Sequence, residues 1–399
     1  MPRRKRLLLV TNRFHPQVGG AEFNIFQQAR ELSNYFDVDV FTPMRDRDPR
    51  HEILDSISIT RGFNFRNLSR TYPDLKTETF CPGVFFKTLF GGYDVVHCFP
   101  SLNRNNILTL LAAKLRGIPV FMSMFDLDDY ASLLDDGVPL QQIFENQVSM
   151  AAKWQVFFRR FSGIFTISSR ETANIKTVNE NTCLSTVPIL IDEYDQKVDV
   201  DDFKKRYAIR PHVPLILCLG RVANLKGQDV LIRALPRLRE KIKDFHVLVM
   251  GRTDHEPEYF ADLQELVKKE DLDQHVTFTG VVPREDVIAA LTACDVHVLP
   301  VRFMNSGAVV IETWAARRPV LHSDGIDPCY VIEGKNGFTF RSEDTEDLCD
   351  KLVSMLEDRQ SGDAMGANGR RLVEEKFLYP HLIQQYMEAY RDRGGVDCC

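Results

Sequence analysis

The sequence predicts an α/β protein made of two doubly wound domains, each built on an open parallel β-sheet. Short apolar and β-branched runs alternate with amphipathic helical segments, which indicates repeated βα units. The series of units occurs twice, and a polar stretch between Ile191 and Pro214 separates the two series. The length of 399 residues agrees with this division, because a single core rarely serves more than about 250–300 residues.

The predicted strands are the apolar runs of each half of the chain. In the first half they are Leu7–Val10, Val38–Phe41, Val95–Cys98, Val120–Met122 and Ile164–Ile167. In the second half they are Leu215–Leu219, His246–Met250, Val276–Phe278, Val296–Leu299 and Val320–Leu321. Amphipathic stretches between these runs, such as Val230–Leu238, supply the helices that would cover both faces of each sheet.

These patterns place one domain at residues 1–200 and a second at residues 201–375, followed by a terminal helix at residues 376–399. The chain ends in two helical segments that are parted at Pro380. Open α/β sheets bind ligands at the carboxyl ends of their strands. Two such domains facing each other would enclose an interdomain cleft, so the functional motifs should directly follow strands.

Composition and charge exclude several classes of protein. Hydrophobic residues make up 44% and charged residues 27%, which is typical of a soluble globular protein. A net charge of −6 argues against nucleic-acid binding over the whole molecule. There is no apolar run of about 18 residues and no signal-peptide pattern. The nine cysteines form no CxxC motif, which favours a cytoplasmic protein without a zinc site.

The N-terminus is locally basic, since "MPRRKR" carries four cations in six residues. One interpretation is a solvated tail before the first strand. The other is peripheral contact with a membrane, because each cation near an anionic lipid surface adds about 1 kcal/mol.

Two glycines follow the first predicted strand in "PQVGGAE". Gly19 and Gly20 allow the backbone to approach a ligand closely, and a helix is predicted to begin near Ala21. Glycines before a helix N-terminus suit a phosphate group. A plain connection between strand and helix explains the same residues.

Two cations follow the first strand of the second half in "LGRVANLKGQD". Arg221 and Lys226 would lie at a strand's carboxyl end, where a pair of cations suits a diphosphate. The alternative is that both are solvated surface cations.

A third motif, "RFMNSGAVVIETWAARRP", follows the strand "VHVLP". Gly307 allows a turn and a helix is predicted to begin by Ala308, so its free amides could bind phosphate. Glu312, one turn further on, could accept hydrogen bonds from a ribose diol. A solvated helix face is less favoured for Glu312, because its neighbours are apolar and an unpartnered acid among them would be costly.

Together these motifs resemble the retaining GT-B glycosyltransferases, in particular glycosyltransferase family 4. The resemblance covers nearly the whole chain. The motifs that carry it, in the order of the family, are "TNRFHPQVGGAE", "YDVVHCFPS", "GIPVFMSMFDLDD", "FSGIFTISS", "VPILIDEYD", "LGRVANLKGQDVLIRALPRL", "FTGVVPREDVIAALTACDVHVLP", "VVIETWAARRPVL" and "GKNGFTF".

The resemblance implies that Arg221 and Lys226 hold the donor diphosphate and that Glu312 holds the ribose. It implies a position beside the diphosphate for Gly20 and a terminal helix that crosses back to the first domain. It also implies metal independence. The remaining donor-binding candidates are Met304, Asn305, Ser306, Gly307, Ala308 and Val309 beside the sugar and phosphates, and Gly251, Arg252, Val281 and Val282 near the base.

The chain departs from the family pattern at two positions. Met304 stands where the family usually has a glutamate that contacts the transferred sugar, and Phe125 stands where it often has a histidine, just before Asp126. Methionine cannot accept a strong hydrogen bond. We interpret this as an altered sugar pocket, suited to a less hydroxylated donor. Loss of catalysis is one alternative; the other is a local shift in which Asn305, Ser306, His97 or Asp126 takes over the missing roles.

Two further candidates lie at or just after the carboxyl ends of strands in the first half. His97 could contact the acceptor or the sugar, although a histidine packed at a strand end is equally consistent with its position. Asp126 is a candidate catalytic carboxylate. The run Asp126, Asp128 and Asp129 could also resemble a metal site, but no metal is expected because the cation pair already neutralises the phosphates.

The sequence therefore predicts a retaining hexosyl- or deoxyhexosyltransferase with no permanently bound cofactor. The donor would be a UDP- or GDP-linked sugar, and the acceptor a glycan or glycolipid, as in polysaccharide biosynthesis. The alternative is a catalytically impaired nucleotide-sugar-binding subunit that supports an active partner. A nucleotide-sugar epimerase lacks support, because no acidic and histidine groups for proton transfer at the sugar are evident.

Overall fold

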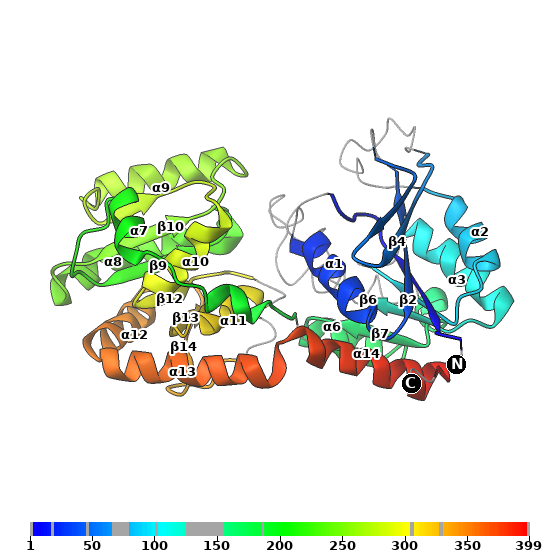
Figure 1. Cartoon of the computed structure of the whole chain (residues 1–399). Coiled ribbons are helices and arrows are strands. Elements are labelled where there is room, and N and C mark those ends of the chain that lie inside the picture. The colour runs from blue at the N-terminus through cyan, green and yellow to red at the C-terminus, as the bar shows by residue number, and fades with distance from the viewer. Residues whose placement is uncertain are drawn as a thin grey trace. The chain divides into compact units, whose positions relative to one another are not determined.

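The computed structural model describes residues 3–16, 20–44, 48–65, 80–99, 103–124, 155–185, 187–303, 307–326 and 330–396. The chain forms two compact units. Unit 1 consists of Met1–Pro188 together with Tyr379–Cys399, and unit 2 consists of Ile189–Leu378. Each unit is built on one sheet of mainly parallel strands accompanied by helices (Figure 1). This confirms the two doubly wound α/β domains that the sequence predicts.

Within the described residues, the sheet of unit 1 has eight strands in the order β3-β4-β2-β1-β5-β6-β7-β8. All neighbours are parallel except β3 and β4. The strands are β1 (Arg6–Val10), β2 (Asp37–Pro43), β3 (His51–Leu54), β4 (Ile57–Gly62), β5 (Val95–Cys98), β6 (Val120–Ser123), β7 (Gly163–Thr166) and β8 (Thr182–Leu184).

Helices cover both faces of this sheet, as the two separate apolar cores show. On one face α2 (Gly83–Phe90) and α3 (Arg104–Arg116) contribute Val84 and Leu110 to a core with strand residues such as Val96. On the other face α1 (Gly20–Leu32) and α14 (Tyr379–Gly394) pack against β1. A short helix, α6 (Ser169–Lys176), follows β7. The central strands β5 and β6 are buried along their whole length, as expected for strands covered on both sides.

The terminal helix α14 belongs to unit 1, although it follows unit 2 in the sequence. Its Tyr386 and Tyr390 are fully buried in the core beneath α1. Pro380 lies in the first turn of α14, where its missing N–H breaks no helical hydrogen bond. The units divide after Pro188 and after Leu378, whereas the sequence placed its boundaries at residues 200 and 375.

In the part of unit 2 that the structure describes, the sheet has six parallel strands in the order β11-β10-β9-β12-β13-β14. This is the doubly wound order of dinucleotide-binding folds, with the switch point between β9 and β12. The strands are β9 (Leu215–Leu219), β10 (His246–Met250), β11 (Val276–Phe278), β12 (Val296–Leu299), β13 (Val320–Ser323) and β14 (Gly337–Phe340). The helices are α7 (Val200–Arg206), α8 (Gln228–Lys241), α9 (Pro257–Lys269), α10 (Arg284–Ala293), α11 (Ala308–Ala315), α12 (Thr345–Glu357) and α13 (Arg359–Lys376).

The predicted strands are all present within two residues at either end. Four strands were not predicted from the sequence, and they lie at or next to the edges of the sheets: β3, β4, β8 and β14. β4 alternates fully and partly buried residues, so it has no continuous apolar run. Within the described residues, no helix is long and apolar enough to cross a membrane.

Candidate functional site

The carboxyl ends of β9, β10 and β11 continue side by side beyond the sheet of unit 2. The amide of Gly220 donates to the carbonyl of Met250 at 2.9 Å, and the amide of Gly251 donates to the carbonyl of Gly280 at 3.1 Å. Gly251 has φ +146°, and a Cβ there would lie 2.0 Å from the Gly220 carbonyl oxygen. Only glycine fits this close approach, which brings the loops that carry Arg221 and Arg252 together.

Arg221 and Lys226 lie at this edge, on the loop that follows β9. The Arg221 side chain is exposed, and its Nη1 is 3.4 Å from His255 Nε2. Lys226 ends a 3₁₀ turn, Asn224–Lys226, that Gly227 closes with φ +63°. A Cβ on Gly227 would lie 1.9 Å from the carbonyl oxygen of Pro300, so the turn packs directly on the chain leaving β12. The loop that carries Arg221 and Lys226 therefore lies at the switch point of the sheet, between the carboxyl ends of β9 and β12.

Arg302 joins the same turn to the start of α8. Its Nη1 and Nη2 each donate at 2.9 Å to the two oxygens of Asp229, and its backbone amide donates to the Leu225 carbonyl at 2.9 Å. The Asp229 side chain is only 8% exposed. Burial alone would raise the pKa of Asp229, but hydrogen bonds from Arg302 and Tyr259 hold it below the usual value. This bidentate ion pair between Arg302 and Asp229 fixes the loop after β12 against the turn that carries Lys226.

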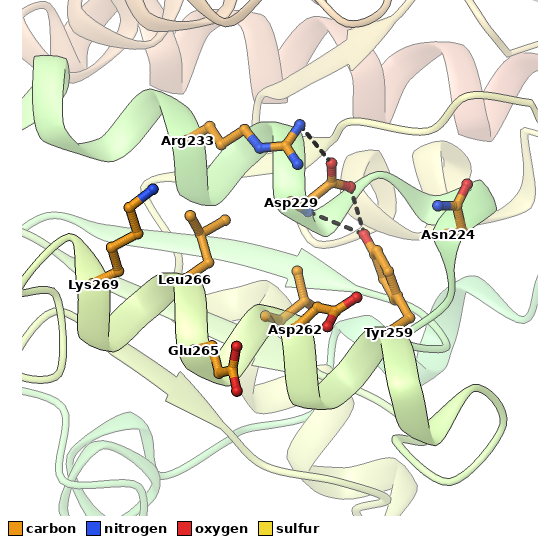
Figure 2. A pocket seen from close by; sticks show the side chains of 9 residues that line it. Asn224, Asp229, Arg233, Tyr259, Asp262, Glu265, Leu266 and Lys269 are labelled. Atoms are coloured by element: carbon orange, nitrogen blue, oxygen red, sulfur yellow. Dashed lines mark hydrogen bonds and ion pairs between the residues drawn. The ribbon is translucent and has the colours of Figure 1, made fainter.

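A polar groove of about 530 Å³ lies beside this pair, between α8 and α9. Figure 2 shows Asp229 held between Arg233 and Tyr259, with Asp262 and Glu265 on α9. The hydroxyl of Tyr259 donates to Asp229 Oδ1 at 2.6 Å and accepts from the Asp229 amide at 3.1 Å. The remaining lining residues are Asn224, Leu263, Leu266 and Lys269. The groove mixes both signs of charge, so it does not select an anion.

Glu312 lies in the second turn of α11 and is bound by two side chains that were not among the predicted site residues. Its Oε1 accepts from Arg284 Nη1 at 2.7 Å and from the Tyr194 hydroxyl at 2.9 Å. Arg284 also pairs with Glu193 at 3.0 Å and donates to the Tyr194 hydroxyl. Burial and the Glu312 charge raise the pKa of Tyr194, which keeps this phenol protonated as a donor.

The start of α11 follows Gly307, which has φ −83° and caps the helix. Ala308 and Val309 form its first turn and are partly buried. The amides of a first helical turn have no partner within the helix, so this end of α11 is able to bind an anion. Gly20 is the first residue of α1 in unit 1. Gly19, Phe125, Asp126, Asp128, Asp129, Met304, Asn305 and Ser306 lie outside the described residues.

His97 lies in the core of unit 1 rather than at an accessible strand end. It is fully buried in β5. One ring nitrogen is 2.5 Å from the Tyr390 hydroxyl, and the other is 2.9 Å from the Ser123 hydroxyl. Burial lowers the pKa of His97 to about 3, so the ring is neutral at physiological pH. We therefore withdraw His97 as a residue that contacts the acceptor or the sugar and assign it to packing between β5 and α14.

The candidate base-binding residues lie at the ends of β10 and β11. Arg252 pairs with Asp254 at 3.0 Å, and both side chains are exposed. Val281 is 74% exposed, whereas Val282 packs against an apolar core. Among the described residues, no three of the types His, Cys, Asp and Glu are grouped so that they could hold a metal ion.

Residues 213–358, which lie within unit 2, match the family described as Glycosyl transferases group 1. A GDP-mannose-dependent alpha-(1-6)-phosphatidylinositol monomannoside mannosyltransferase of Mycolicibacterium smegmatis is 31% identical over 175 residues, 42% of this chain and 44% of that protein. The enzyme of the same name from Mycobacterium tuberculosis is 29% identical over 198 residues, 48% of this chain and 50% of that protein. The chain thus spans about half the length of these relatives.

Solved structures resemble nearly the whole chain. Sucrose-phosphate synthase from Thermosynechococcus elongatus has a TM-score of 0.74 at 20% identity, covering 97% of this chain and 98% of that one. HepE from Anabaena, in complex with UDP and glucose, has a TM-score of 0.69 at 17% identity, covering 96% and 98%. These likenesses show that the fold is GT-B.

Proposed function

We propose that this chain, whose fold is GT-B and whose residues 213–358 match the Glycosyl transferases group 1 family, is a glycosyltransferase that uses a nucleotide diphosphate sugar. The observation that carries the proposal is the family match over the unit that gathers Arg221 and Lys226 at the switch point of its sheet. The acceptor is a glycan or a glycolipid. Closure of the two domains around the donor stays a prediction from the sequence.

The proposed reaction retains the configuration of the transferred sugar. The bond between the anomeric carbon and the diphosphate breaks, and the acceptor oxygen attacks from the same face. The departing diphosphate takes the acceptor's proton, so the protein mainly supplies position and positive charge. Arg221, Lys226 and the amides at the start of α11 would supply that charge. Asp126 remains a proposed catalytic candidate.

Glu312 is proposed to bind the ribose while it stays paired with Arg284. A carboxylate has about four lone-pair sites, and Arg284 and Tyr194 both bond to Oε1. The carboxylate is therefore held in place by residues of its own unit. We propose Gly251, Arg252, Val281 and Val282 for the base, and Gly20 and the segment 304–309 for the phosphates and sugar.

Donor identity is the first question for experiment. The mycobacterial relatives are named as GDP-mannose-dependent, whereas the Anabaena structure holds UDP and glucose. The protein should therefore be incubated with UDP- and GDP-linked sugars, with and without glycan and glycolipid acceptors, while released nucleoside diphosphate is measured. Acceptor-dependent release supports the proposal. Tight nucleotide binding without release would instead favour a non-catalytic subunit. This alternative rests on Met304 and Phe125, which stand where the family commonly has polar residues.

We place the protein in the cytoplasm, with peripheral contact at a membrane through its basic N-terminus. Arg3 and Lys5 are exposed and share a single carboxylate, Asp94, and Arg4 lies 3.9 Å from Asp37. The exposed cations thus remain accessible to an anionic surface, which supports this proposal.

Replacing Met304 with glutamate is expected to change the preferred donor sugar while leaving the affinity for the bare nucleoside diphosphate nearly unchanged. A carboxylate at this position would favour a sugar hydroxyl and would be poorly partnered opposite a deoxy or methyl group. Such a mismatch costs about 1–3 kcal/mol, or roughly tenfold to a hundredfold in relative rate. The measurement is the ratio of kcat/KM for a hydroxylated and a deoxygenated donor. Met304→Gln is the control for side-chain size, and an unchanged ratio in Met304→Glu would exclude position 304 from the sugar pocket.

Transfer activity is expected to survive an excess of EDTA, because Arg221 and Lys226 take the place that a divalent cation would occupy beside the diphosphate. The assay is product formation after chelation, compared with chelated protein to which Mg²⁺ or Mn²⁺ has been restored. Loss of activity on chelation and its recovery with metal would identify the Asp126–Asp129 run as a ligand cluster and contradict the proposed mechanism.

A further inference from the structure

Two neighbouring helices of unit 1, α2 and α3, carry no acidic residue at all. Their sequences are GVFFKTLF and RNNILTLLAAKLR, and their cations are Lys87, Arg104, Lys114 and Arg116. The chain as a whole has more acidic than basic residues, 56 against 50, so overall composition does not explain this. Lys114 and Arg116 are exposed and form no ion pair within the described part of the chain. Lys87 pairs with Asp39 at 3.7 Å, so the positive charge without an acidic partner in the described part of the chain is that of Lys114 and Arg116.

The same helices expose large apolar side chains on the side away from the sheet. Phe86 and Phe90 on α2 are 58% and 76% exposed, and Leu111 and Leu115 on α3 are 45% and 70% exposed. Each pair is four residues apart, so its members lie one turn above each other on one side of the helix. The opposite side of each helix is already buried against the sheet. Figure 1 shows α2 and α3 next to each other. We call Phe86, Phe90, Leu111, Lys114, Leu115 and Arg116 the α2–α3 face.

The basic N-terminal segment lies next to one end of this face. α2 ends at Phe90, and the following residue, Gly91, accepts a hydrogen bond from the Arg6 guanidinium through its carbonyl. Arg3 and Lys5 reach Asp94 in the same turn, at 3.1 and 3.4 Å. The cations of the N-terminus therefore extend the positive region beyond Phe90.

We propose that the α2–α3 face is the docking surface of this protein for an anionic phospholipid bilayer. The four apolar side chains enter the boundary between headgroups and acyl chains, while Lys114 and Arg116 contact lipid phosphates at its rim. This combination of exposed apolar and cationic residues is the pattern of surfaces that bind membrane interfaces. The proposal concerns lipid binding alone and does not depend on the transfer reaction.

A second copy of this chain fits the face less well. In a two-fold symmetric dimer the α2–α3 face of one copy would pack against the same face of the other. Lys114 and Arg116 of the two copies would then lie in one interface with no acidic side chain of the face to pair with them. An anionic bilayer complements both properties of the face, because it offers negative phosphates above an apolar interior.

The test is sedimentation of the full-length protein with vesicles of phosphatidylcholine, with or without phosphatidylglycerol. We expect binding that requires the anionic lipid and weakens as salt is raised. Lys114→Gln with Arg116→Gln is expected to lower the partition coefficient by more than about tenfold, since each cation contributes roughly fivefold. Phe90→Ala with Leu115→Ala is expected to lower it by about tenfold or more.

Matched controls remove similar side chains elsewhere. Ile53→Ala removes an 80% exposed side chain from β3, and Lys268→Gln with Lys269→Gln removes two exposed cations from α9. Both controls should bind vesicles like the natural protein. Thermal melting of each variant checks that the fold is unchanged.

Three results would overturn the proposal. The first is absence of binding to phosphatidylglycerol vesicles. The second is binding that survives in the α2–α3 face variants but is lost when Arg3, Arg4 and Lys5 are changed to glutamine, which would leave the terminus as the contact. The third is a dimer in sedimentation without lipid that the face variants dissociate, which would make the face an interface between copies.

Discussion

Replacing Asp229 with alanine is expected to lower the free energy of unfolding of unit 2 by about 3 kcal/mol. The Asp229 side chain is 8% exposed, and its two oxygens accept hydrogen bonds from Nη1 and Nη2 of Arg302. The Arg302 side chain is 19% exposed. Removing one partner of a buried ion pair leaves an uncompensated charge and typically costs about 3–5 kcal/mol. The lower end of that range applies, because Glu343 also pairs with Arg302. Urea unfolding followed by circular dichroism measures the difference.

Asp262→Ala is the matched control, because Asp262 is an exposed carboxylate that lines the same groove. A surface substitution of this kind should change the stability by no more than about 0.5 kcal/mol. If Asp229→Ala is equally mild, the pairing of Arg302 with Asp229 makes little contribution to the stability of unit 2.

The effect of Asp229 should also depend on pH. Its pKa is lower in the folded protein than in the unfolded chain, so the carboxylate stabilises the fold at pH values above the ordinary carboxyl range. That contribution is lost as the pH falls through the folded-state pKa, below about 4. The difference in stability between the natural protein and Asp229→Asn should therefore shrink in acid. A difference that is constant with pH would contradict the lowered pKa.

Replacing Arg221 with alanine is expected to weaken the binding of a nucleoside diphosphate by about 1.5–3 kcal/mol, the range for hydrogen bonds to charged groups. This corresponds to a roughly tenfold to hundredfold rise in Kd. The Arg221 side chain is exposed at the edge of the sheet, and its loop is held by backbone contacts of Gly220 and Val222, so the fold should be unchanged. Calorimetry with UDP and GDP measures the affinity.

Arg359→Ala is the control for general loss of positive charge in unit 2. Arg359 is 62% exposed and pairs with Asp295, which precedes β12, so it lies toward the amino ends of the strands. Its loss should leave the affinity for nucleotide unchanged. Arg221→Lys should retain part of the affinity, because lysine keeps the charge but not the planar fork. An Arg221→Ala variant with undiminished affinity would exclude this edge as the diphosphate site.

Much of the fold could be predicted because buried parallel strands are continuous apolar runs in the sequence. β9 and β10 were predicted to the residue, since both are almost entirely buried. β4 and β14 could not be found in this way, because each contains partly exposed residues that interrupt the apolar run. Whether such a segment becomes a strand depends on the neighbour that pairs with it, such as β2 for β4.

The position of Arg221 and Lys226 could also be anticipated, because the carboxyl ends of parallel strands share one edge. The residues that pair with Asp229 and Glu312 could not be predicted from the sequence. Asp229 and Arg302 are 73 residues apart, and Glu312 and Tyr194 are 118 residues apart. The apolar neighbours of Glu312 indicated that it needed a partner, but nothing local identified Arg284 or Tyr194.

By itself, the sequence determined the two α/β series, their strands and the motifs that follow those strands, because these depend on local periodicity and on glycine positions. Only the tertiary structure decided the environment of individual polar groups. His97 is the clearest example, since the sequence allowed both an accessible and a packed histidine. Its burial is set by Tyr386 and Tyr390 of α14, and Tyr390 lies 293 residues further along the chain. A side chain's solvation and pKa depend on what packs against it from distant segments, and no local pattern carries that information.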